Sequence, residues 1–325
     1  MSWRPHVKGN KSIAVVKKEL AAGAIGITCA KLGEAEIMAA GGVRDILIAN
    51  QIIGEIKIAR LLDLLERTSV IVAVDSIGNI DALAAAADKR STRIPVVIEV
   101  NIGMDRAGLE PGEPVVTLAR AIAARTGLRF MGIMGWESHA VTIADPAEKR
   151  GIVADAISRL TRSAEACRRA GHEVRIVSCG GTGTFPFCVE QPGVTEVQVG
   201  GGIFGDVHYR DHYHVDFPCA LTLLATITSR PTPTRIVLDA GKKAMSSDAA
   251  LPEPIGLPAI RQLRLSAEHA TIELAQPSEF PAIGDRLNFL VGYSDTTVHL
   301  HEQLFGIRNG RIEAVWRVDA RGALR

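Results

Sequence analysis

Residues 3–12 decide how the rest of the chain is interpreted, and they read Trp3-Arg4-Pro5-His6-Val7-Lys8-Gly9-Asn10-Lys11-Ser12. A short apolar strand would end here among basic side chains. Glycine follows Lys8, so the chain can turn sharply and leave this lysine accessible. A lysine amine at the end of a barrel strand can form a Schiff base with a carbonyl group. Arg4, His6 and Lys11 are its candidate neighbours, and the alternative is a basic segment that is simply solvated.

Short apolar runs then alternate with longer helical patterns. The predicted strands are residues 3–8, 24–30, 45–50, 69–75, 94–101, 128–136, 174–179 and 195–200, and the predicted helices are 11–22, 33–40, 55–67, 79–90, 113–125 and 147–170. In the third helix, Ile56, Ala59, Leu62 and Leu65 have helical spacing. Strands alternating with helices indicate a parallel sheet, and eight such units in about two hundred residues predict a closed (β/α)₈ barrel. The main rival is an open doubly wound sheet.

The pattern changes in the last third of the chain. Residues 206–218 contain three histidines, at 208, 212 and 214, and we interpret this segment as a polar linker because the spacing matches no recognised metal-ligand set. Further strands are predicted at 221–229, 235–240, 263–265, 271–274, 286–292 and 304–318, and Asn309-Gly310 predicts a hairpin. The predicted fold class is α/β, with a (β/α)₈ barrel in residues 1–216 and a mostly antiparallel β domain in residues 217–325.

The composition is that of an ordinary globular protein, with 47% hydrophobic and 22% charged residues and a net charge of +1. This charge does not indicate a nucleic acid partner, and no apolar run is long enough to predict a membrane span. The five cysteines are scattered and odd in number. They show neither a disulfide framework nor a zinc spacing, which predicts a cytoplasmic location.

The active site of such a barrel lies at the carboxyl ends of its strands. Lys8 ends the first predicted strand, Arg106 follows the fifth, and His139 follows the sixth. Two glycine-rich loops follow the last two strands, and the candidate cofactor-binding residues there are Ser178, Gly180, Gly181, Thr182, Gly200, Gly201 and Gly202. Glycine lets backbone N–H groups approach phosphate oxygens closely. A phosphate cradle together with a reactive lysine predicts pyridoxal phosphate as the cofactor.

These residues resemble the D-threonine aldolase and D-serine dehydratase-like family of fold-type III pyridoxal phosphate enzymes, to which alanine racemase is more distantly related. The similar segments are residues 4–8, 28–36, 100–108, 238–243 and 266–269 with the two glycine loops, so the resemblance covers essentially the whole chain. It implies a homodimer in which each active site is closed by the partner's β domain. The lysine that binds the cofactor corresponds to Lys8 rather than Lys11, and the arginine near the cofactor ring corresponds to Arg106.

The chain departs from the family in its first and sixth strands. Family members usually carry a few dozen residues before the Arg-Pro-His motif, whereas almost none precede Arg4, so either the start is truncated or this branch lacks that segment. The family often has Tyr-x-Gly-His after strand six, and this chain has Trp136-Glu137-Ser138-His139. A tyrosine hydroxyl near the cofactor is therefore expected to be lost.

A third departure concerns the family's divalent metal. Its ligands, a His and an Asp or Cys, correspond here to Tyr293 and Asp295. A phenol is a poor ligand, so Asp295 would remain alone unless His299 or His301 replaces the lost imidazole. We expect a metal-independent or weakly metal-binding site, with Tyr293 as an acid–base group or hydroxyl anchor and Asp295 orienting it. If this stretch is extended, both side chains share one face.

The resemblance implies an enzyme, a pyridoxal phosphate-dependent lyase that cleaves D-β-hydroxy amino acids by a retro-aldol reaction. Its catalytic residues would be Lys8, Tyr293, Asp295 and His139, and its partner a small amino acid substrate of unknown identity. A D-serine dehydratase-like β-elimination and an amino acid racemase are alternatives. A pyridoxal phosphate carrier without turnover is less consistent with the β domain. A sugar-phosphate barrel enzyme in which Lys8 binds substrate is the remotest alternative.

Overall fold

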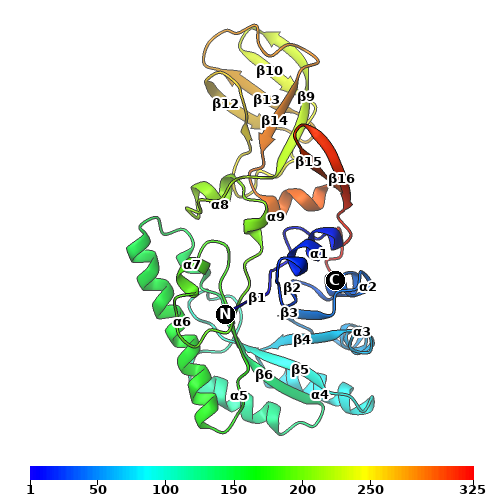
Figure 1. The fold of residues 1–325 in the computed structure, drawn as a ribbon, viewed down its shortest axis with the longest axis vertical. Helices are drawn as coiled ribbons and strands as arrows, with labels where there is room; N and C mark the ends of the chain where they lie inside the picture. Colours follow the sequence, from blue (N-terminus) through cyan, green and yellow to red (C-terminus); the bar gives the residue numbers. More distant parts are fainter. The chain divides into compact units, whose positions relative to one another are not determined.

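The computed structural model describes all residues from Met1 to Arg325. The chain forms two compact units (Figure 1). The first, here called the barrel unit, contains Met1–Gly200 and Gly322–Arg325. The second, here called the β unit, contains Gly201–Arg321.

Eight parallel strands form the sheet of the barrel unit, in the order β1-β8-β7-β6-β5-β4-β3-β2. Their bounds are β1 (Ser2–Trp3), β2 (Ile27–Cys29), β3 (Asp45–Gln51), β4 (Ser69–Val74), β5 (Ile94–Glu99), β6 (Leu128–Met134), β7 (Ile176–Cys179) and β8 (Glu196–Val197). The segment after β1 closes the sheet against β2, because the Val7 N–H donates to the Thr28 carbonyl at 2.9 Å and the Thr28 N–H to the Pro5 carbonyl at 2.8 Å. The predicted barrel is therefore confirmed, and the open sheet is excluded.

The strands are short and almost wholly apolar because both of their faces are covered. One buried apolar cluster of the barrel comprises Leu47, Ile71, Ala73, Val97, Met134 and Ile176, drawn from five neighbouring strands. Side chains that fill the barrel in this way leave the strand ends, rather than the barrel axis, as the place for chemistry.

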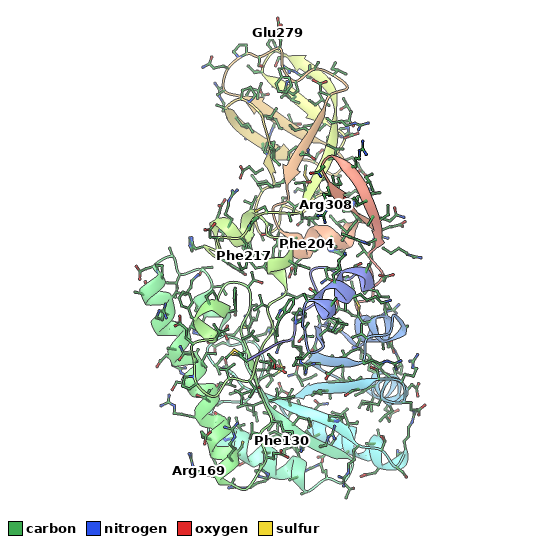
Figure 2. All side chains as sticks on the ribbon, in the orientation of Figure 1. Phe130, Arg169, Phe204, Phe217, Glu279 and Arg308 are labelled. Atoms are coloured by element: carbon green, nitrogen blue, oxygen red, sulfur yellow. The ribbon has the colours of Figure 1, made fainter.

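Helices lie outside the strands (Figure 1). Their bounds are α1 (Ile13–Ala21), α2 (Leu32–Ala40), α3 (Glu55–Leu65), α4 (Ile77–Lys89), α5 (Glu113–Ala123), α6 (Pro146–Arg169) and the single turn α7 (Phe185–Cys188). Asp145 begins α6 as a cap, since its carboxylate accepts from the Glu148 N–H at 2.7 Å. Phe130 on β6, labelled in Figure 2, meets the ring of His172 edge-on with centroids 6.2 Å apart.

The third predicted helix is observed as α3, but only part of its apolar set faces the barrel. Ile56 is 79% exposed, and the face of α3 that packs on the barrel contains Ile58, Leu61, Leu62 and Leu64. Residues spaced three apart drift around an α-helix of 3.6 residues per turn, so their spacing alone does not decide which of them face the core. The packing of α3 against β4 and the neighbouring helices α2 and α4 decides which residues are buried.

The β unit is built on a six-stranded antiparallel sheet in the order β11-β14-β9-β10-β13-β12. The bounds are β9 (Thr222–Thr232), β10 (Arg235–Leu238), β11 (Glu253–Pro254), β12 (Ile260–Leu265), β13 (Ala270–Leu274) and β14 (Arg286–Leu290). A separate hairpin joins β15 (Gln303–Arg308) to β16 (Arg311–Arg317) through Asn309-Gly310. Both turn residues have positive φ, 50° and 72°, as the sequence predicts for this pair.

Two segments of the β unit differ from the sequence prediction. Residues 206–218 are not merely a polar linker, because they contain the helix α8 (Val207–Asp211) and bury Asp206 and Tyr209. The Tyr293 stretch is not continuously extended, because α9 (Ser294–Thr297) begins directly after it. No helix of the structure has the length and apolar character needed to cross a membrane.

Candidate active site

Lys8 lies in the turn that follows β1, at the carboxyl end of the barrel. Its Nζ atom is 5.6 Å from the centroid of the Trp136 ring, and the guanidinium of Arg106 lies at the same distance from that ring. Trp136 comes directly after β6, and Arg106 belongs to the loop after β5. The structure therefore brings together Lys8 and Arg106, the lysine and the arginine that the sequence predicts for the site. They meet around the Trp136 ring, to which the sequence analysis assigned no role.

Lys11, the alternative lysine, is held in a buried ion pair. Its Nζ atom lies 2.9 Å from Oε1 of Glu34, whose side chain is fully buried. The other oxygen of Glu34 accepts from the Ala30 N–H at 2.6 Å. Lys11 thus balances a buried carboxylate, which favours Lys8 over Lys11 for covalent chemistry.

Arg4 is not a neighbour of Lys8, and that part of the prediction is wrong. Its guanidinium pairs with Glu196 at 3.0 Å and Asp45 at 2.6 Å, at the starts of β8 and β3. Arg4 therefore secures the opposite end of the barrel. An extended segment rises about 3.3 Å per residue, so side chains four residues apart lie near opposite ends of a short barrel strand.

His6, by contrast, is a neighbour of the lysine. Its Nδ1 atom accepts from the Lys8 backbone N–H at 3.3 Å. Burial lowers the pKa of the His6 imidazole well below its usual value, and the cations of Lys8, Lys11 and Arg106 lower this pKa further. The ring is neutral at physiological pH, so it adds no charge beside the lysine.

The loop after β7 is anchored by Glu137, a residue that sequence reasoning did not assign to the site. Glu137 is fully buried. One of its oxygens accepts from the Thr184 hydroxyl at 2.5 Å and the Cys188 thiol at 3.3 Å, and the other accepts from the Gly180 N–H at 3.3 Å. Three donors from one loop and its short helix therefore converge on a single carboxylate.

Several groups of the predicted phosphate cradle have partners within the protein. The Gly181 N–H donates to the Thr184 hydroxyl at 3.3 Å, and the Ser178 hydroxyl accepts from Gln198 at 2.9 Å. Thr182 is buried in the same loop. Gly180 has a φ of 80°, so glycine is required there for the backbone turn. Phosphate binding by these residues stays a prediction.

The glycines after β8 are explained by close approaches. A Cβ on Gly200 would lie 2.0 Å from the His6 carbonyl oxygen, in the seam that closes the barrel. Within the β unit, a Cβ on Gly201 would lie 2.2 Å from the Tyr209 hydroxyl, and Gly202 continues the same turn of η2 (Gly201–Ile203). A side chain at Gly201 would therefore displace Tyr209 instead of simply filling a cradle.

The loop after β5 carries Arg106 and meets His139. Arg106 is exposed and lies 3.9 Å from Glu99, an ion pair too long to hold it firmly. Glu99 itself is buried and accepts from Gln51 at 2.7 Å, and burial raises its pKa. His139 is exposed in η1 (Ser138–Ala140), and a Cβ on Gly103 would lie 2.5 Å from its ring. Arg106 and His139 thus belong to adjoining loops at one end of the barrel.

Tyr293 and Asp295 belong to the β unit. The Tyr293 hydroxyl donates to Asp295 at 3.1 Å, although only Tyr293 itself is extended. Burial raises the pKa of Tyr293, and the neighbouring charge of Asp295 raises it further. His301, a suggested replacement ligand, contacts the Ala244 carbonyl at 2.6 Å instead.

All three tyrosines of the chain gather around this pair. The rings of Tyr209 and Tyr293 are 5.9 Å apart, and His208 packs 4.9 Å from Tyr293. Asp206 joins the two segments, since it accepts from the Ser294 N–H at 2.7 Å and the Tyr209 N–H at 2.8 Å. The histidine-rich segment that we predicted to be a linker therefore supports the Tyr293 region.

Comparison with known proteins identifies the family. The model described as "Alanine racemase, N-terminal domain" matches residues 3–208, and a model for a serine dehydratase domain matches residues 220–307. The 3-hydroxy-D-aspartate aldolase of Paracoccus denitrificans strain Pd 1222 is 34% identical over 333 aligned residues, which cover 99% of this chain and 85% of that protein. The chain belongs to the D-threonine aldolase and D-serine dehydratase-like family.

Solved structures of the family agree with this assignment. D-Threonine aldolase from Filomicrobium marinum has a TM-score of 0.95 and 33% identity, covering all of this chain (100%) and 89% of its own. D-threo-3-Hydroxyaspartate dehydratase from Delftia sp. HT23 has a TM-score of 0.88 and 26% identity, covering 98% of this chain and 90% of its own. The fold is that of a pyridoxal phosphate-dependent family. The predicted domain boundary at residues 216–217 falls between the two matched models and stays a prediction.

Proposed function

We propose that this protein is a pyridoxal phosphate-dependent lyase that cleaves D-β-hydroxy amino acids by a retro-aldol reaction. One observation carries the proposal most directly: Lys8 lies over the Trp136 ring at the barrel mouth, while Lys11 is held by Glu34. The family assignment adds the reaction class, because members similar over nearly the whole chain are a 3-hydroxy-D-aspartate aldolase and a D-threonine aldolase. The lyase predicted from the sequence agrees with these relatives.

The residues at the barrel mouth fit pyridoxal phosphate. Lys8 offers the amine that would hold it, and the Trp136 Nε1 atom is buried without a hydrogen-bond partner. The predicted cradle residues Gly180, Gly181 and Thr182 lie in a loop that is hydrogen-bonded to the Glu137 carboxylate. When bound, the cofactor supplies a conjugated ring that accepts the electron pair left on the substrate α-carbon.

The protein's own residues would bind and orient the substrate. The Arg106 guanidinium is exposed and only loosely paired, so it can hold the substrate carboxylate in a fixed orientation. His139, which we predict to be a catalytic residue, lies on the adjoining loop. His6 stays neutral because of its lowered pKa, so it does not compete with Lys8 or Arg106 for anionic groups.

Tyr293 and Asp295 are assigned to the substrate β-hydroxyl. The raised pKa of Tyr293 keeps the proton on its Oη atom at neutral pH, which suits a hydroxyl anchor better than a base. Asp295 accepts that proton in a hydrogen bond and so orients the phenol. A protonated phenol beside one carboxylate is a poor set of metal ligands, so the proposed site binds a divalent metal weakly or works without one.

A β-eliminating dehydratase is the second candidate, since the dehydratase from Delftia sp. HT23 shares the fold over 98% of this chain. A racemase is the third. The test is to incubate the protein with pyridoxal phosphate and then with D-threonine, 3-hydroxy-D-aspartate or D-serine. Glycine plus an aldehyde supports the aldolase. An oxo acid plus ammonia supports the dehydratase. Interconversion of the D and L amino acids supports the racemase. The corresponding L-amino acids serve as controls, and turnover of none of the D substrates would contradict the lyase.

The proposal includes a cytoplasmic homodimer. The five cysteines of the chain are all free thiols, which agrees with a reducing compartment. One face of the β15–β16 hairpin presents Phe305, Ile307, Ile312 and Val315, each more than half exposed. An apolar face of this kind supports association with another copy. Light scattering should give twice the chain mass of 34.7 kDa, and a monomer at micromolar concentration would contradict the dimer.

A further inference from the structure

Trp136 carries an N–H group that the protein alone does not use. The Nε1 atom is buried and has no hydrogen-bond partner. Trp3, in the same unit, shows the usual behaviour, since its Nε1 donates to the Val199 carbonyl at 2.8 Å. Buried indole N–H groups almost always find an acceptor, so the missing partner of Trp136 requires an explanation.

The position of this N–H indicates what it could bind. A Cβ built on Gly181 would lie 2.9 Å from Trp136 Nε1, so the polar edge of the indole faces the glycine loop after β7. The ring of the same tryptophan lies 5.6 Å from the Lys8 amine and 5.6 Å from the Arg106 guanidinium. One indole thus has its N–H donor at a glycine-rich loop and two cations within 5.6 Å of its ring centroid, and positive groups of this kind attract an anion.

No acceptor of the protein takes this role. The nearest carboxylate in sequence is Glu137, and its oxygens already accept from Gly180, Thr184 and Cys188. Trp136 is not among the donors to this carboxylate, and its Nε1 atom stays without a partner. An oxygen supplied by a bound anion would satisfy Nε1 and leave the Glu137 contacts intact.

We propose that Trp136 is a cofactor-binding residue whose Nε1–H donates a hydrogen bond to a phosphate oxygen of pyridoxal phosphate. The proposal rests on the proposed function, because it takes that cofactor as the ligand. It also gives a role to Trp136 at a position where the family often has tyrosine, since the indole N–H is a hydrogen-bond donor as a tyrosine hydroxyl is.

The test separates the phosphate from the rest of the cofactor. Dissociation constants of pyridoxal phosphate and of pyridoxal, which lacks the phosphate, are measured by fluorescence quenching for the wild-type protein and for Trp136→Phe. Phenylalanine keeps an aromatic ring but has no N–H. Removing a hydrogen bond to a charged group should weaken pyridoxal phosphate binding about tenfold to hundredfold, and pyridoxal binding should stay within about twofold.

Two further variants complete the experiment. Trp136→Tyr restores a donor and should recover most of the lost affinity. Trp316→Phe makes the same chemical change in the β unit and should leave both constants unchanged.

Equal losses for both ligands, or no loss for pyridoxal phosphate, would overturn the assignment of Nε1 while leaving the proposed function in place. A wild-type protein that binds neither compound would contradict the proposed function and this inference together.

Discussion

The substitution Glu137→Gln tests whether one buried carboxylate holds the loop after β7. An amide has only one acceptor oxygen. If this oxygen keeps the bonds from Thr184 and Cys188, the new NH₂ group faces the Gly180 N–H, which donates to Glu137 at 3.3 Å. The backbone N–H cannot rotate away, so two donors would meet in a buried position. An unsatisfied buried donor destabilises a protein by about 1–3 kcal/mol.

Calorimetry can measure this effect. For a unit of about 200 residues, each kcal/mol lowers the melting temperature by about 2–4 °C, so we expect the barrel unit of Glu137→Gln to melt roughly 2–12 °C lower. The matched control is Glu66→Gln, the same change at an exposed position. It should shift the melting temperature of the barrel unit by less than about 2 °C. An unchanged transition for Glu137→Gln would refute the reasoning, because it would mean that the three hydrogen bonds do not depend on a carboxylate.

Three other substitutions test separate parts of the account. Burial raises the pKa of Glu19 to about 7, against an ordinary value of 4.5, so the stability that its neutral form contributes is present below pH 4.5 and is lost as the pH rises through 7. Chemical denaturation at about pH 5 and about pH 8 measures the free energy of unfolding of Glu19→Gln and of wild type. Relative to wild type, the variant should be more stable at pH 8 than at pH 5 by on the order of 3 kcal/mol, and the same pH dependence in both proteins would contradict this. Lys11→Ala leaves Glu34 buried without its cation and should lower the free energy of unfolding by about 3–5 kcal/mol. The variant should keep the absorbance of bound pyridoxal phosphate. A folded variant that lacks this absorbance would reverse the assignment of the two lysines. Tyr293→Phe should lower the lyase rate at least about tenfold, and EDTA should leave wild-type activity intact; a stoichiometric divalent ion whose removal abolishes activity would contradict the metal-weak site.

The sequence predicts the barrel because its signal is repeated. Each predicted strand is a short apolar run, and the first six are each followed by a helical pattern. An error in the bounds of one strand or helix therefore leaves the overall alternation, and so the predicted fold, unchanged. The bounds agree within a few residues in β3, where 45–50 is predicted and Asp45–Gln51 observed. Agreement is poor for β8, where 195–200 is predicted and only Glu196–Val197 is paired, and poorer for β1, where 3–8 is predicted and Ser2–Trp3 observed.

Side-chain direction was the part that the sequence could not supply. Arg4 and Lys8 are four residues apart in one basic segment, yet Arg4 pairs with Glu196 and Asp45 at the far end of the barrel. Those partners come from strands that are distant in the chain. The third helix shows the same limit, since only packing distinguishes the buried Ile58 from the exposed Ile56.

The residues that sequence reasoning missed are those defined by what surrounds them. Glu137 follows Trp136 in a segment that we examined for its histidine, and nothing local reveals that three donors from residues 180–188 converge on its carboxylate. The vacant hydrogen-bonding position of Trp136 is likewise visible only in three dimensions. A useful signal was present, however, because an acidic residue at the end of a buried barrel strand requires hydrogen-bond donors nearby.

The central claim is that Lys8 holds pyridoxal phosphate, and one measurement tests it most directly. The protein is incubated with the cofactor, treated with borohydride to make the bond to the lysine permanent, digested, and mapped by mass spectrometry. The account predicts that the added mass lies on Lys8 and that Lys8→Ala carries none. Added mass on Lys11 would contradict the assignment of the lysine, and a protein that carries no added mass would contradict the cofactor itself.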